Sequence, residues 1–257
     1  MIPRTPLLAT LFAVCMAGHG APACAAEVTV LTAGAFRPVL DALAPSLERE
    51  NHVHLTITND TAGELAKRIR AGAAFDVAIL PEPLARTLAD EGNLAPTVSP
   101  VARVGIGVAV PEGAPKPDIS TVEQFKQALL AAPSVAYLDP AAGGSSGIYL
   151  SKLFQTLGIA QAIAPKAVLV HGGLVGTRLV DGQAALAVHQ VSELLAVPHI
   201  QYVGPLPAAI QNDTVYAAGL SAHAKSVEGA RALLDALRSK EAASLLERKG
   251  MEPAAPQ

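Results

Sequence analysis

Two histidines stand directly after apolar segments that are typical of buried strands. His171 follows AVLV (167–170), and His189 follows ALAV (185–188). In an open α/β sheet the residues at the carboxyl ends of the strands face the ligand crevice, and an imidazole titrates near neutral pH. The pattern predicts that one of the two histidines transfers a proton in catalysis. The alternative is that both are structural.

A second group of residues has the chemistry of an anion site. The turn GGSS (143–146) precedes a helix pattern, so its backbone N–H groups and the hydroxyls of Ser145 and Ser146 can hold an anion. Arg37 begins a helix after a strand, as either a carboxylate clamp or a solvated arginine. Thr61 precedes another helix, where its hydroxyl can cap the helix or contact the ligand. Arg178 lies in the helix pattern that follows His171.

Composition excludes several classes of protein. The chain has 257 residues, of which 51% are hydrophobic, and its 19 Lys plus Arg stand against 22 Asp plus Glu, a formal net charge of −3. The apolar content is too high for a disordered chain, and the charge offers no basic surface for nucleic acid. The sequence has neither a P-loop nor a nucleophile elbow, and no His pair has the spacing of a metal site on one helix. We expect no cofactor and no metal.

The first residues have the pattern of a secretory signal peptide. Arg4 precedes an apolar run over 7–18 (LLATLFAVCMAG), and the small residues ACAA (23–26) follow. Cleavage after Ala26 would remove Cys15 and Cys24, the two cysteines of the chain, so no disulfide partner remains. The mature protein is therefore expected in the periplasm.

The rest of the chain alternates strand patterns with helix patterns, which predicts parallel sheets covered by helices. The strand patterns cover 28–32, 52–58, 75–80, 101–110, 134–138, 166–170, 184–189, 200–203 and 213–220. The helix patterns cover 36–50, 62–71, 83–91, 121–131, 145–157, 174–180, 227–238 and 241–249. A proline-rich segment follows 101–110, and another precedes 213–220. These points predict two α/β lobes, the first made of 27–102 plus 214–257 and the second of 103–213.

Four segments, in order, resemble the periplasmic molybdate-binding proteins of ABC importers. They are VTVLTAGAFRPVLDAL (28–43), GELAKRIRAGAAFDVAIL (63–80), DPAAGGSSGIYLSKLFQTLG (139–158) and KEAASLLERKGMEP (240–253). The resemblance implies the type II periplasmic binding protein fold, in which two α/β lobes joined by a hinge close on a small anion in a central cleft.

The sequence departs from the molybdate pattern where that family holds its ligand. Ala35 stands where the family usually has a serine, Ala62 lies in a loop that is serine-rich in the family, and Gln190 aligns with a tyrosine. Hydroxyl donors are thus lost or moved, and Arg37 adds a positive charge beside the first loop. A compact oxyanion needs donors close around it, whereas a larger carboxylate fits an Arg fork.

The stretch VHQVSELLAVPHIQYVGPLPAAIQ (188–211) resembles a branch of this superfamily that includes aconitate isomerase. That resemblance implies interconversion of trans- and cis-aconitate by movement of an allylic proton, with His171 or His189 as the base. The alternative is a binding protein that delivers an oxyanion or small carboxylate to an ABC importer permease. The substrate-binding residues expected for either function are Ala35, Arg37, Thr61, Ala62, Ser145, Ser146, Arg178 and Gln190.

Overall fold

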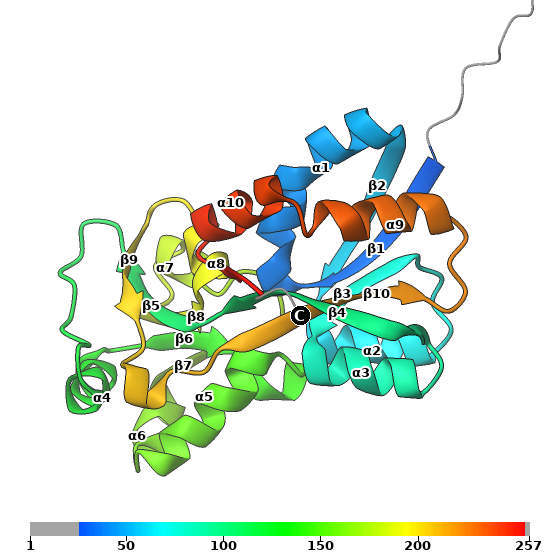
Figure 1. The fold of residues 1–257 in the computed structure, drawn as a ribbon. Coiled ribbons are helices and arrows are strands. Elements are labelled where there is room, and N and C mark those ends of the chain that lie inside the picture. The colour runs from blue at the N-terminus through cyan, green and yellow to red at the C-terminus, as the bar shows by residue number, and fades with distance from the viewer. Residues whose placement is uncertain (1–25, 255–257) are drawn as a thin grey trace, which may run out of the picture.

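The computed structural model describes residues 26–254, which form two α/β lobes, each built on its own sheet (Figure 1). The predicted signal peptide lies outside the described residues except for Ala26, where the first strand begins. Across residues 26–254, none of the helices combines the length and apolar character that crossing a bilayer requires.

The first lobe contains a six-stranded sheet in the order β11-β4-β10-β3-β1-β2. Its strands are β1 (Ala26–Ala33), β2 (Val53–Asp60), β3 (Val77–Pro81), β4 (Leu94–Val104), β10 (Thr214–Ser221) and β11 (Glu252–Pro253). β1 pairs in parallel with β2 and β3, whereas β10 runs antiparallel to β3 and β4. The returning strand β10 therefore closes the first lobe after the chain has built the second.

Helices cover both faces of this sheet. They are η1 (Gly34–Phe36), α1 (Arg37–Asn51), α2 (Ala62–Arg70), α3 (Glu82–Asp90), α9 (Val227–Ala236) and α10 (Lys240–Arg248). Figure 1 shows α1, α9 and α10 on one side and α2 and α3 on the other. α1 buries Val39, Leu40, Leu43 and Leu47, which recur at helical spacing, against the sheet.

The second lobe contains a five-stranded sheet in the order β7-β6-β8-β5-β9. Its strands are β5 (Ile106–Pro111), β6 (Val135–Leu138), β7 (Ala167–Val170), β8 (Leu186–Gln190) and β9 (Ile200–Pro205). Its helices are α4 (Val122–Ala131), η2 (Pro140–Ala142), α5 (Ser145–Thr156), α6 (Ala160–Ile163), η3 (Ala164–Lys166), α7 (Thr177–Val180), α8 (Val191–Leu195) and η4 (Ala208–Ile210). Side chains of β8 alternate between two cores, Leu186 and Val188 on the α5 side and Ala187 on the α8 side.

The prediction of one long strand over 101–110 is wrong. The chain bends at Gly105, so that β4 ends the first sheet at Val104 and β5 begins the second at Ile106. A Cβ on Gly105 would lie 3.0 Å from Asp213 Oδ1, so the returning segment packs directly against it. The side chain of Gln211 completes this hinge by pairing with the backbone N–H (2.8 Å) and carbonyl (2.9 Å) of Ile106.

Two further expectations change in detail. The expected boundary between 102 and 103 falls inside β4, because β4 continues to Val104 in the first sheet. The helix pattern over 174–180 yields one turn, α7, and the structure adds α8 directly after β8, where no helix was expected.

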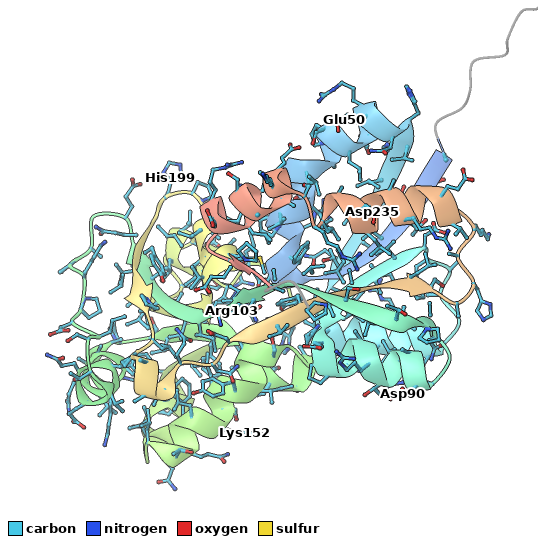
Figure 2. The ribbon with its side chains drawn as sticks, viewed as in Figure 1. Glu50, Asp90, Arg103, Lys152, His199 and Asp235 are labelled. Atoms are coloured by element: carbon cyan, nitrogen blue, oxygen red, sulfur yellow. The ribbon has the colours of Figure 1, made fainter. Side chains whose placement is uncertain are left out.

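Charged side chains lie mainly on the outside of the molecule. Figure 2 shows Glu50, Asp90, Lys152 and Asp235 pointing outward from their helices, and all four are exposed. The electrostatics of the space between the lobes therefore depend on a few buried polar groups.

Candidate functional site

A small cavity lies between the two lobes, at the carboxyl ends of strands from both sheets. Its volume is about 30 Å³. The lining residues from the first lobe are Ala33, Gly34, Asn59, Asp60, Thr61, Ala62 and Tyr216. Those from the second lobe are Leu138, Gly144, Ser145, Ser146, Gly173, Gln190 and Glu193. This is the place where an open α/β sheet presents its ligand site.

The two lobes touch beside this cavity, at residues that belong to its lining or lie close to it in sequence. Thr61 Oγ1 donates a hydrogen bond to the carbonyl oxygen of Ala142 at 2.5 Å, and it accepts one from the backbone N–H of Glu64 at 3.3 Å. The Gly63 backbone N–H donates to the Gly143 carbonyl oxygen at 3.2 Å. Thr61 therefore caps α2, as one of the two alternatives expected, and the same hydroxyl joins the lobes; contact with a ligand stays a prediction.

Two helices begin at the cavity wall. α2 starts at Ala62 and α5 at Ser145, and both residues line the cavity. Gly144, the residue before α5, has no side chain with which to cap it, and a Cβ at this position would overlap Leu138 Cδ2. The first-turn N–H groups of a helix carry partial positive charge, so these two helix starts favour an anionic ligand.

A hydrogen-bonded network joins the lobes behind the helix starts. Gln190 Nε2 donates to Ser145 Oγ at 3.1 Å and to Thr214 Oγ1 at 3.0 Å. The Tyr216 hydroxyl donates to Gln190 Oε1 at 3.0 Å. These contacts fix the orientation of the Gln190 amide. Burial raises the pKa of Tyr216, so this phenol stays protonated at neutral pH.

Glu193 brings a buried carboxyl group to the cavity wall. The residue is 6% exposed, and a Cβ on Gly34 would overlap its Oε1. Burial raises the pKa of Glu193 to about 8 and lowers the pKa of the neighbouring His189 to about 3. At pH 7 both side chains are therefore mostly neutral, and the 3.4 Å approach of His189 Nδ1 to Glu193 Oε2 is not an ion pair.

The structure brings half of the expected site residues to the cavity. Thr61, Ala62, Ser145, Ser146 and Gln190 all line it. They share a position at the end of a strand or the start of a helix. This feature singled out Thr61, Ser145 and Ser146 in the sequence, whereas the family resemblance pointed to Ala62 and Gln190.

Neither expected histidine lines the cavity. His171 follows the edge strand β7; its side chain is 84% exposed, with Nδ1 2.9 Å from Asp139 Oδ2. His189 is 1% exposed and is turned toward Glu193 on α8. Because successive side chains of a strand alternate between faces, Gln190 at the end of β8 reaches the cavity and His189 does not.

Ala35, Arg37 and Arg178 also lie outside the cavity lining. Ala35 is buried, and its carbonyl oxygen accepts a hydrogen bond from Ser192 Oγ at 2.8 Å. Arg37 Nε pairs with Asp41 Oδ1 at 2.6 Å, one helical turn along α1. Arg178 Nη1 contacts Gln183 Oε1 at 3.2 Å. Both guanidinium groups are thus engaged by neighbours in their own lobes.

Sequence reasoning missed Glu193 and Gly34, and it favoured a packing role for Tyr216. The sequence patterns indicated no helix directly after 184–189, so Glu193 could not be placed and carried no signal. Its position on the cavity wall depends on α8, which the structure adds directly after β8.

The chain resembles characterised proteins over nearly its whole length. Residues 28–252 match the bacterial extracellular solute-binding protein family. A Pseudomonas sp. protein named aconitate isomerase is 36% identical over 268 aligned residues, which cover 98% of this chain and 98% of that protein.

Two solved structures share the fold. The periplasmic molybdate-binding protein of Azotobacter vinelandii has a TM-score of 0.72 at 18% identity, with 90% of this chain and all (100%) of that chain covered. The sulfate-binding protein SubI of Mycobacterium tuberculosis H37Rv has a TM-score of 0.70 at 16% identity, with 90% and 88% covered. The expected type II periplasmic binding protein fold is thereby confirmed. Together with the match over residues 28–252, it makes this chain a member of the bacterial extracellular solute-binding protein family.

Proposed function

We propose that this protein is an exported isomerase that interconverts trans- and cis-aconitate in the periplasm, after cleavage of its signal peptide behind Ala26. The observation that carries the proposal is the composition of the cavity. It combines two helix starts, which suit carboxylates, with a titratable carboxyl group at Glu193. The whole-chain relative named aconitate isomerase supports the same reaction.

The proposed site binds the substrate through its carboxylates. The N–H groups at the starts of α2 and α5 and the hydroxyls of Thr61, Ser145 and Ser146 supply donors. Glu193 is mostly neutral at pH 7, so it does not repel an anion that enters. The negative charge of Asp60 is balanced by an ion pair with Arg68, whose Nη2 lies 2.6 Å from Asp60 Oδ2.

Substrate binding requires the lobes to separate first. A cavity of about 30 Å³ holds roughly one water molecule, and a tricarboxylate needs many times that volume. We propose that opening breaks the contact between Gly63 and Gly143 and that closure around the substrate restores contact between the lobes. Closure then excludes water from the reacting carbons.

A second function has support from the fold and the family. A binding protein for a molybdate-like oxyanion or a small carboxylate would use the same helix starts and the same closure, and would deliver its ligand to an ABC importer permease. The absence of a hydroxyl donor at Ala62, which lines the cavity, favours a carboxylate over molybdate in either case.

One experiment separates the two functions. Purified mature protein is incubated with trans-aconitate, and the products are separated by chromatography, while calorimetry measures the binding of trans-aconitate and of molybdate. We expect formation of the cis isomer and weak molybdate binding. Tight molybdate binding with no heat from a carboxylate would contradict both the substrate and the reaction.

A further inference from the structure

We infer that Glu193 is the single acid–base residue that moves the allylic proton of the substrate; this inference rests on the proposed isomerase function. Glu193 lies on the cavity wall, on α8, with its carboxyl against the backbone of Gly34. The helix starts that would hold the substrate carboxylates, at Ala62 and Ser145, line the same cavity.

Comparing the titratable residues that line the cavity as candidate bases also leads to Glu193. Three of the residues that line the cavity are titratable: Asp60, Tyr216 and Glu193. Asp60 accepts a hydrogen bond from the Thr61 backbone N–H at 2.8 Å and pairs with Arg68, so both of its carboxylate oxygens are already engaged. Tyr216 donates a hydrogen bond to Gln190 Oε1, and because burial raises its pKa it stays neutral. Glu193 is left as the group that can both take and return a proton near neutral pH.

The reaction balances with this one residue. The ionised Glu193 carboxylate takes a proton from the substrate methylene, and the C–H electron pair spreads through the double bond onto the carboxylate at the far end. The resulting Glu193 carboxylic acid then gives the same proton to the former alkene carbon, and the double bond moves by one position. The torsion about the carbon–carbon bond in the bound substrate decides which isomer forms.

The environment of Glu193 suits a base for a weak carbon acid. A carboxylate with a raised pKa is a stronger base than an ordinary glutamate, because burial makes its charge costly. The titratable groups that face it are His189 from β8 and Tyr216 from β10, and both are neutral at pH 7. Positive charge at the helix starts can stabilise the substrate anion that forms.

The pH dependence follows from the need for an ionised base. We expect kcat/KM to rise with pH, about tenfold per unit below the pKa of Glu193, and to level off above pH 8, since this parameter reports groups of the free protein. A histidine base that titrates near its ordinary value would instead level off near pH 6.5.

The test uses Glu193→Gln, which keeps the shape of the side chain and removes the base. We expect kcat to fall by about 10²–10⁴-fold while the dissociation constant for trans-aconitate changes less than about threefold. Glu228→Gln is the matched control, because Glu228 is an exposed glutamate on α9 and is not among the residues that line the cavity. His171→Asn should leave kcat within about twofold, since His171 lies outside the cavity.

A label experiment tests whether one residue serves both carbons. With trans-aconitate deuterated at the methylene, transfer by a single shielded carboxyl group should leave part of the transferred deuterium in the cis product made in ordinary water. Glu193→Asp, with its carboxyl one methylene farther back, should slow turnover without abolishing this retention.

The outcomes separate this inference from the proposed function. Wild-type isomerisation with normal turnover by Glu193→Gln would overturn the role of Glu193 and leave the isomerase function standing. A loss of turnover in His171→Asn as large as that in Glu193→Gln would also contradict it. If the wild-type protein binds trans-aconitate without converting it, the isomerase function fails, and the inference fails with it.

Discussion

Gly63 of the first lobe and Gly143 of the second lobe touch through their backbones. The Gly63 N–H donates to the Gly143 carbonyl oxygen at 3.2 Å. A Cβ on Gly63 would lie 2.9 Å from Gly143 Cα, and one on Gly143 would lie 2.8 Å from Gly63 Cα. The absence of two side chains thus lets the lobes close over the cavity, and Gly143 also needs the left-handed conformation (φ 75°) that glycine adopts most readily.

Closure should be sensitive to a single methyl group. Gly63→Ala should weaken trans-aconitate binding, because the added Cβ meets backbone atoms that cannot rotate away. It should also lower the free energy of unfolding of the closed form, because the helix preference of Ala over Gly, at most about 1 kcal/mol, does not remove the overlap with the Gly143 backbone. Calorimetry and thermal unfolding give the two quantities. Gly204→Ala is the control, because its added Cβ would be 3.8 Å from the nearest atom; equal affinities for the two variants would argue against a backbone latch.

Gly34 should affect turnover by leaving room for the carboxyl group of Glu193. Gly34→Ala places a Cβ on top of Glu193 Oε1 and must displace the carboxyl group. A displacement of about 1 Å in a reacting group can cost on the order of 10²-fold in rate, so we expect kcat to fall by that order. Gly172→Ala, whose added Cβ meets nothing within 4 Å, should turn over normally in the same chromatographic assay. Unchanged turnover by Gly34→Ala would show that the carboxyl position does not matter.

Folding stability should have its maximum on the acid side of neutrality. Glu193 has a pKa of about 8 when folded and 4.5 when exposed, so unfolding releases a proton between these values and stability falls as pH rises toward 8. His189 has a pKa of about 3 when folded and 6.5 when exposed, so stability falls as pH drops below 6.5. The two effects oppose each other between pH 4.5 and 6.5, which is the expected plateau.

The Glu193 contribution can be isolated by substitution. The Gln side chain of Glu193→Gln cannot ionise. The free energy of unfolding of this variant minus that of the wild type should therefore increase as pH rises from 6.5 to 8. Denaturant unfolding at three or four pH values measures the difference. Parallel curves for the two proteins would mean that Glu193 titrates in the folded protein as it does in water.

Arg37 should contribute little to ligand affinity. Its guanidinium pairs with Asp41 on the same helix, and its side chain is 37% exposed. Arg37→Ala should therefore cost under about 1 kcal/mol of stability and change the affinity for a tricarboxylate less than about twofold. Asp41→Ala should have a similar small effect on stability. A loss of about 2–5 kcal/mol of affinity would instead identify Arg37 as a buried carboxylate clamp.

Local patterns in the sequence, together with the family resemblance, found part of the wall of the cavity. Thr61, Ser145 and Gln190 each stand where a strand ends or a helix begins. The carboxyl ends of parallel strands meet at one edge of a sheet, so the alternation of strands and helices already implies that such residues converge. The break at Gly105 was missed because the apolar pattern runs unchanged through it. The sheet that each strand joins is decided by its pairing with segments distant in the chain, which the local pattern does not show.

The chemistry of the site was decided by the tertiary structure. Glu193 is an ordinary first-turn acid until Gly34 from the other lobe covers it and His189 packs beside it, and only the loss of water raises its pKa. His189 and Gln190 are neighbours in the chain, yet the direction of each side chain at the end of β8 sends Gln190 to the cavity and His189 away from it. Local periodicity in the sequence indicated the alternation of strands and helices, and the resemblance to periplasmic binding proteins implied the two-lobed fold and the place of the site. Burial and side-chain direction depend on contacts between distant segments, and these selected the group able to move a proton.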